Sequence, residues 1–368
     1  MTYPYFQENK VRGRYVTNAC LEPFYNSIQP FFTVTELGNS VAERPIKEIR
    51  MGSGPIKILM WSQMHGNEST TTKAVLDFVR FMESECTLSK ALLSACTISI
   101  VPILNPDGAE AYTRVNANLV DLNRDAQERT QPESMVLRRL YDHFSPDFCF
   151  NLHDQRTIFN VGTTPLPATV SFLAPAHDEE RNISSSRAIS MKLIVAMDGL
   201  LQTLIPGQVG RYDDGFNSNC AGDAFQMLGT PTILFEAGHY PGDYGRERTR
   251  EFVYYAILKA VDTIAKGELD THKTERYFEI PENDKLFYDV LIRNSHLINA
   301  SHAVGTDVGI LYKEVLEDGD ISFLPEVAKM GKLTEYLGHK VYNALDINDI
   351  NSMKEHASLW SVLGSTLG

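Results

Sequence analysis

The sequence predicts an α/β domain with a mostly parallel sheet, followed by a small β-rich domain. Through the first two thirds of the chain, short apolar runs alternate with longer helical patterns, which is typical of a parallel sheet. After Gly267 the pattern changes to short runs separated by polar turns. The length of 368 residues also suits two domains. We therefore divide the chain into residues 1–268 and residues 269–368.

Four short apolar runs in the first domain are expected to be buried strands. Continuous apolar runs between turn residues are typical of strands covered on both faces. The expected strands are Ile56–Trp61, Thr97–Leu104, Asp147–Leu152 and Thr232–Phe235. Helical patterns lie between and after them, over Thr70–Met82, Pro132–His143, Ser186–Leu204 and Arg246–Ala265. This alternation predicts strands that run in the same direction, with their carboxyl ends at one edge of the sheet.

The second domain is predicted from five short patterned runs. These are RYFEI from residue 276, LFYDVLI from 286, VGILYKEV from 308, ISFLP from 321 and HKVYNAL from 339. Turn clusters at residues 281–284 and 317–320 separate some of them. Short runs with frequent turns favour a β-rich fold.

Composition excludes several classes of partner. Lys and Arg number 34 against 47 Asp and Glu, which gives a net charge of −13. Such a chain repels phosphate backbones and anionic lipids, so neither nucleic acid nor a membrane is an expected partner. No apolar run reaches the length of a membrane span, and the first residues lack the pattern of a secretory signal. The five scattered cysteines suit a reducing compartment, so we expect a cytoplasmic protein.

Polar residues that suit a metal site follow three of the expected strands. His65 and Glu68 follow the first strand, His153 follows the third and Glu236 follows the fourth. Ligands of open α/β sheets bind at the carboxyl ends of the strands, where these side chains converge. Two histidines and a glutamate suit catalytic zinc, because a fourth position stays open for water or substrate. Glu236 would then be free to act on that water, since an acid directly after an apolar strand must be paired or functional.

Each of these residues also has a plainer interpretation. A single HxxE pattern often occurs by chance, and His65 could be a hydrogen-bonded loop histidine. Arg114 and the Asn123–Arg124 pair lie between the expected ligands. Arginine binds carboxylates in a bidentate manner, so Arg124 could hold a terminal carboxylate and Arg114 could stabilise a developing negative charge. Alternatively, both arginines form ion pairs on the surface of an acidic protein.

Five motifs in order resemble the zinc carboxypeptidases, the carboxypeptidase A-like metallopeptidases. The motifs are HGNE at 65–68, NPDG at 105–108, DLNRD at 121–125, NLHD at 151–154 and LFEAG at 234–238. The related aspartoacylase and succinylglutamate desuccinylase branch shares much of this pattern and also carries a β-rich C-terminal domain. The resemblance, over about residues 50–260, implies a three-layer α/β/α sandwich around a mixed, largely parallel eight-stranded sheet. It also implies one Zn²⁺ per chain.

The resemblance assigns roles motif by motif. It implies that the zinc ligands are His65, Glu68 and His153, that the general base is Glu236, that Arg114 stabilises the oxyanion, and that Asn123 and Arg124 bind the substrate carboxylate. Tyr212 is the nearest candidate for the mobile tyrosine of the family's peptidases. Asp214 or Asp223 could face a basic substrate group, or lie in a solvated acidic loop.

The expected activity is hydrolysis of an amide bond by metal-activated water, with removal of a C-terminal residue. The substrate would be a peptide or an N-acyl amino acid with a free carboxylate. The alternatives are a deacylase of the aspartoacylase type, an amidase for cell-wall peptides, and a zinc-binding or peptide-binding module without catalysis. The presence of Glu236 argues against the last. A purely structural zinc site is disfavoured because no cysteine lies beside the expected ligands.

Overall fold

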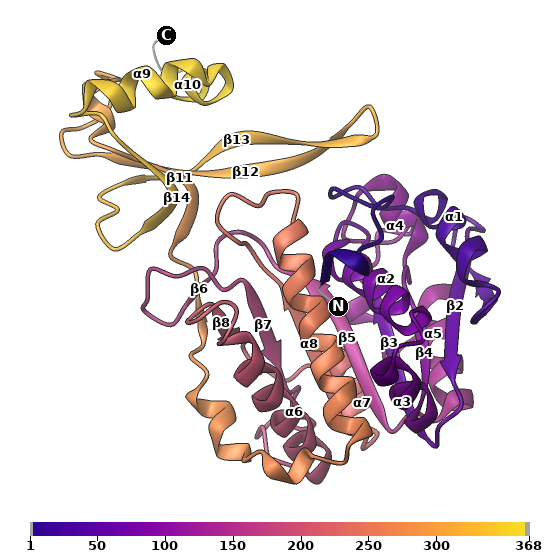
Figure 1. Cartoon of the computed structure of the whole chain (residues 1–368). Coiled ribbons are helices and arrows are strands. Elements are labelled where there is room, and N and C mark those ends of the chain that lie inside the picture. The colour runs from indigo at the N-terminus through magenta and orange to yellow at the C-terminus, as the bar shows by residue number, and fades with distance from the viewer. Residues whose placement is uncertain (1–2, 365–368) are drawn as a thin grey trace.

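An eight-stranded mixed sheet forms the centre of the first domain (Figure 1). The structure is a computed structural model that describes residues 3–364. The strand order is β1-β2-β4-β3-β5-β9-β7-β8, and β4, β3, β5 and β9 run parallel to one another. The strands are β1 (Thr33–Asn39), β2 (Pro45–Gly52), β3 (Ile56–Ser62), β4 (Cys96–Val101), β5 (Phe148–Asp154), β7 (Val170–Leu173), β8 (Val209–Arg211) and β9 (Thr232–Ala237). The predicted fold class is confirmed.

Helices cover both faces of this sheet and bury two apolar cores. One core lies under α1 (Asn18–Ile28), α2 (Thr70–Glu83), α3 (Thr87–Ala95), α6 (Ser185–Leu201) and α8 (Glu247–Ala265). The other core lies under α5 (Pro132–Phe144) and α7 (Ala221–Met227), where Trp61 packs edge-on against Phe225. The short helix α4 (Pro106–Ala111) follows β4. The central strands are apolar on both sides because both faces are covered.

The second sheet has four strands in the order β13-β12-β11-β14. The strands are β11 (Phe287–Arg293), β12 (Asp307–Glu317), β13 (Asp320–Gly331) and β14 (Leu337–Asn343). Two helices, α9 (Ile347–Glu355) and α10 (Ala357–Gly364), pack on one face, where Met353 and Leu359 join the core of the sheet. The long hairpin of β12 and β13 extends over the first domain (Figure 1).

Residues 269–284 connect the two sheets and pack on the first domain. The run RYFEI, expected as part of the β-rich domain, lies in a 3₁₀-helix over Thr274–Glu279. Its Tyr277 is fully buried in the first domain's core, and the Tyr277 hydroxyl accepts a hydrogen bond from the Ala174 amide at 3.2 Å. The expectation of a strand-like run was wrong because this aromatic packs against the larger sheet. A two-stranded ribbon of β6 (Asn160–Val161) and β10 (Asn283–Asp284) follows.

The division of the chain at residue 268 stays a prediction. Within residues 3–364, no helix is both long and apolar enough to cross a membrane.

Candidate metal and active site

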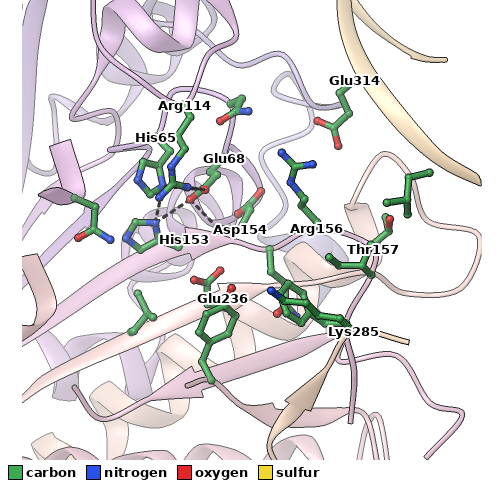
Figure 2. A pocket seen from close by; sticks show the side chains of 18 of the residues that line it. His65, Glu68, Arg114, His153, Asp154, Arg156, Thr157, Glu236, Lys285 and Glu314 are labelled. Carbon is green, nitrogen blue, oxygen red and sulfur yellow. Dashed lines mark hydrogen bonds and ion pairs between the residues drawn. The ribbon is translucent and has the colours of Figure 1, made fainter. Parts of the chain in front are cut away.

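The carboxyl ends of the parallel strands open into one cavity of about 1150 Å³ (Figure 2). The loop after β3 brings His65 and Glu68 to this cavity, β5 brings His153 and β9 brings Glu236. His153 and Glu236 are neighbours in register across β5 and β9. The sheet therefore places side chains that are far apart in the sequence at one edge, as expected from parallel strands.

Close backbone packing holds the loop after β3. A side chain on Gly66 would approach the Gly108 carbonyl carbon to 1.9 Å, so only glycine lets this loop lie against α4. The Gln63 amide donates hydrogen bonds to the carbonyls of Val16 and Gly66, at 2.7 and 2.8 Å. The HGNE loop is therefore held by its packing against α4 and by the Gln63 hydrogen bonds, and these contacts fix the backbone that carries His65.

Three side chains point their donor atoms at one another. The two carboxylate oxygens of Glu68 lie 2.8 Å from His65 Nδ1 and 2.8 Å from His153 Nδ1, and the two Nδ1 atoms are 3.1 Å apart. These three side chains form a potential metal-binding group whose donor atoms all lie within 4.8 Å of one another. Two imidazoles and a carboxylate suit a divalent metal such as zinc. The structure thus brings together the three ligands expected from the sequence.

Protonation of this group also fits metal binding. Burial alone would raise the pKa of the Glu68 carboxyl, but the two neighbouring histidines hold this pKa well below its ordinary value. The Nε2 atom of His153 is buried and has no hydrogen-bond partner within the described part of the chain. The second ring nitrogen of His65 lies 3.0 Å from Asp121 Oδ1. That contact assigns the proton to Nε2 and leaves the Nδ1 lone pair of His65 for a metal.

Asp121 is a residue that the sequence did not single out. It contacts His65 through Oδ1 and accepts a hydrogen bond from Arg114 Nε through Oδ2 at 3.0 Å. Metal-binding histidines commonly donate their second nitrogen to a carboxylate, which orients the ring. Its only sequence signal is its place in the DLNRD motif. We infer from these contacts that Asp121 positions both His65 and Arg114.

Replacing Asp121 by Asn is expected to weaken zinc binding by about 10- to 100-fold, because the carboxamide orients the His65 ring less strongly. Competition with a chromogenic chelator measures the affinity. Asp142→Asn, on the exposed face of α5, is the matched control and should leave the affinity unchanged. Equal affinities for the wild type and the Asp121 variant would contradict the positioning role.

Glu236 lies beside the potential metal-binding group without a partner. Its side chain faces His153 and Glu68 in Figure 2, and its Oε2 atom is buried with no hydrogen-bond partner among residues 3–364. Burial, and then the charges of Glu68 and Asp154, raise the pKa of Glu236 well above its ordinary value. A buried, unpaired acid costs stability, so its presence in a cavity indicates function rather than structure.

Arg114 lies against the same group. Its Nη1 atom is 3.3 Å from Glu68 Oε1 and 3.2 Å from His65 Nδ1. A guanidinium at this position is placed to stabilise negative charge that develops beside a bound metal. The structure therefore brings Arg114 to the potential metal-binding group, and its role stays a prediction.

The Asn123–Arg124 pair lies next to Asp121, at the cavity. The Asn123 backbone donates to Asp121 Oδ1 at 2.9 Å, and its side-chain oxygen accepts from the Ala221 amide at 2.9 Å. Arg124 Nη1 contacts the Asn123 carbonyl at 2.6 Å and the Cys220 sulfur at 3.0 Å. Arg124 has no carboxylate partner in the described part of the chain. Its guanidinium is thus available to a carboxylate from outside.

Tyr212 and Asp223 also line the cavity. Tyr212 follows β8, its ring centroid lies 5.5 Å from that of Phe159, and burial, followed by the Glu236 charge, raises its pKa. Asp214 forms ion pairs with Arg181 at 3.0 Å and Arg187 at 2.6 Å, so it is committed to a structural role. Of the two aspartates considered from the sequence, Asp223 is the one that faces the cavity.

Replacing Asp223 by Asn is expected to stabilise the protein above neutral pH. Burial raises the pKa of Asp223 from 3.8 to about 6, so the folded state holds its proton more tightly than the unfolded state. Its contribution to stability is present at low pH and lost as the pH rises through 6. The variant should gain about 1–3 kcal/mol over the wild type at pH 7.5 and much less at pH 4. Urea unfolding at several pH values measures this, and a gain independent of pH would contradict it.

The second domain completes the wall of the cavity. Tyr312, Glu314 and Phe323, on the β12–β13 hairpin, line it. Glu314 accepts hydrogen bonds from Arg14, at 3.1 Å, and from the Tyr112 hydroxyl. These contacts join the hairpin to the first domain across the cavity from the potential metal-binding group (Figure 2). Sequence reasoning missed these residues, because nothing near them in the chain indicates a contact with the first domain.

Comparisons with known proteins agree with this geometry. The profile of the zinc carboxypeptidase family matches residues 18–165. Gamma-D-glutamyl-L-diamino acid endopeptidase 1 of Lysinibacillus sphaericus is 34% identical over 87 residues, which cover 22% of this chain and 22% of that protein. Carboxypeptidase E of Caenorhabditis elegans is 31% identical over 143 residues, covering 31% of this chain and 30% of that protein. The matches thus span between about a fifth and a third of these relatives.

Solved structures show the same fold. A metallo-carboxypeptidase from Burkholderia cenocepacia has a TM-score of 0.55 at 21% identity, over 67% of this chain and 70% of that one. A metallo-carboxypeptidase from Pseudomonas aeruginosa, in complex with (2-guanidinoethylmercapto)succinic acid, has a TM-score of 0.51 at 17% identity, over 68% and 70%. These structures confirm the predicted fold, and the family profile spans four of the five motifs, from HGNE to NLHD.

Proposed function

We propose that this chain, a relative of the zinc carboxypeptidases by its family match and its fold, hydrolyses amide bonds and removes the C-terminal residue of a peptide. The observation that carries the proposal is the buried, unpaired Glu236 beside the group of His65, Glu68 and His153. A metal-binding group with a free acid next to it has the parts that hydrolysis by activated water requires.

The same three side chains would hold one zinc ion, through the two Nδ1 atoms and the Glu68 carboxylate. When bound, zinc supplies Lewis-acid chemistry, which polarises a carbonyl group and makes water more acidic. The fit rests on the converging donor atoms and on the orientation of His65 by Asp121.

The other cavity residues then bind the substrate and stabilise the reaction, each in a separate role. Asn123 and Arg124 hold the free carboxylate of the substrate, so that the terminal amide bond lies beside Glu236. Glu236 takes a proton from the attacking water and passes it to the leaving amine. Arg114 stabilises the negative charge that develops on the carbonyl oxygen. Tyr212, which also lines the cavity, contacts the bound substrate.

A second candidate is deacylation of an N-acyl amino acid with the same residues. The observation in its favour is that residues of the β12–β13 hairpin form part of the cavity wall, where they would contact an acyl group. A third candidate is a cell-wall peptide, since the Lysinibacillus relative is named for cleavage at a diamino acid. In that case Asp223 would face the side-chain amine of the leaving residue.

The test compares three sets of compounds with the zinc-loaded protein, read by mass spectrometry. The sets are peptides with varied C-terminal residues, the same peptides with amidated C-termini, and N-acetyl amino acids. Loss of one residue from the free peptides alone is the expected result. Release of acetate alone would replace the proposal by the deacylase, and the absence of product from every set would contradict catalysis.

A further inference from the structure

Cations line the cavity on the side away from the Asn123–Arg124 pair. Arg156 follows β5, and Lys285 lies between β10 and β11. In Figure 2 both lie on the opposite side of the cavity from His65 and Arg114, with Glu236 between. The Asn123–Arg124 pair belongs to the Arg114 side, because Asp121 binds both Arg114 and the Asn123 backbone.

Neither cation is neutralised by the protein. Within residues 3–364, the side chains of Arg156 and Lys285 form no hydrogen bond or ion pair, and the Lys285 ammonium only lies 5.8 Å from the Phe159 ring centroid. By contrast, two other cavity arginines are paired, Arg14 with Glu314 and Arg114 with Asp121. Unpaired cations are unexpected in a chain with a net charge of −13.

Nearby acids are committed elsewhere. Glu314 is bound by Arg14 and by the Tyr112 hydroxyl. Asp289 accepts hydrogen bonds from the Tyr244 hydroxyl at 2.7 Å, from the Thr157 hydroxyl at 3.1 Å and from the Tyr312 amide at 2.8 Å. Glu326 lies 3.6 Å from Lys313, a third cation of the same wall. The side of the cavity around Arg156 and Lys285 is therefore open to an anion from outside.

We infer that Arg156 and Lys285 form a second anion-binding subsite, for a carboxylate on the acyl side of the cleaved bond. The inference rests on the proposed function. With one carboxylate at Arg124 and the amide beside Glu236, the part of the substrate before the cleaved bond extends toward Arg156 and Lys285. The substrate is then a dicarboxylate: a peptide with an acidic residue before the cleaved bond, or an amino acid with an acidic acyl group. Guanidinium and ammonium groups bind such a carboxylate with charge-assisted hydrogen bonds.

Matched peptides test the preference. They differ only in the residue before the cleaved bond, which is Glu, Gln or Lys. We expect kcat/KM to fall in that order, with Glu at least about tenfold above Gln, as one charge-assisted contact implies. The double variant R156Q/K285Q should lose the preference, and R156E/K285E should favour Lys. K266Q, at an exposed position directly after α8, is the control and should keep the wild-type order.

A binding measurement separates this inference from the proposed function. Calorimetry with the E236Q variant should give a dissociation constant at least about tenfold lower for the Glu peptide than for the Gln peptide. Equal kcat/KM values for these two peptides would overturn the subsite and leave the carboxypeptidase activity standing. Failure to cleave any compound would contradict the proposed function, and the calorimetry would still decide on the subsite. N-succinyl and N-acetyl amino acids, compared in the same way, distinguish an acidic acyl group from an acidic residue.

Discussion

Replacing Glu236 by Gln is expected to lower kcat by about 10²- to 10⁴-fold while zinc and peptide still bind. Glutamine keeps the size and position of the side chain but accepts no proton, so the loss measures general-base catalysis. Steady-state kinetics give kcat, elemental analysis gives the metal content, and calorimetry gives peptide affinity. Glu251→Gln, on α8 and paired with Arg248 away from the cavity, is the matched control and should leave all three values unchanged.

The same variant should be more stable than the wild type in the metal-free protein. Glu236 is buried with one oxygen unpaired, and its neighbours Glu68 and Asp154 carry like charge. Removing a carboxyl that the fold does not stabilise relieves a cost of about 1–3 kcal/mol, which thermal unfolding would detect. Wild-type turnover in the Glu236→Gln variant would show that Glu236 is not the general base. Lower stability would show that the carboxyl has a structural partner.

The central strands could be predicted because each is buried on both faces. β3, β5 and β9 coincide with largely apolar runs of the sequence, broken only by single polar residues such as Lys57 and Asn151. The outer strands gave no such signal. β1 is exposed or half-buried at every position, and β8 has only three residues and pairs with β7, which lies about 40 residues earlier in the chain. Edge strands take their structure from the neighbouring strand, which composition does not record.

The convergence of the candidate ligands could be predicted for a related reason. His65 follows β3, and His153 and Glu236 lie in the last residues of β5 and β9, so the parallel topology brings them together at one edge. Asp121 lies 56 residues from His65, in a loop whose path no local pattern indicates. Glu314, on the hairpin, meets Arg14 across 300 residues. The Glu314 contact depends on how the hairpin packs on the first domain, and the sequence analysis had no signal for that. The roles of all these residues stay predictions.

Replacing Asp77 by Asn is expected to lower the free energy of unfolding by about 3–5 kcal/mol. Asp77 on α2 and Arg250 on α8 are both fully buried, with Arg250 Nε 2.7 Å from Asp77 Oδ2. The Tyr3 hydroxyl and the Glu8 amide also donate to this carboxylate, each at 2.7 Å. Breaking a buried pair from one side leaves the buried Arg250 charge to its second partner, the part-exposed Glu247 at 3.0 Å, which costs more than the pair contributed.

Chemical unfolding at neutral pH measures the effect, with Asp142→Asn as the control. Asp142 pairs with Arg138 on the exposed face of α5, at 2.9 Å, so its loss should cost less than about 1 kcal/mol. An equally small change in the free energy of unfolding for the Asp77 variant would contradict the role of the buried pair.

Because Asp77 and Arg250 do not line the cavity, turnover per folded molecule of the Asp77 variant should stay at the wild-type value. The Asp77 and Glu236 variants then have opposite signatures. The Asp77 variant should lose stability and keep its turnover per folded molecule, whereas the Glu236 variant should stay folded and lose turnover. The pair of variants therefore distinguishes a residue that stabilises the fold from one that takes part in catalysis.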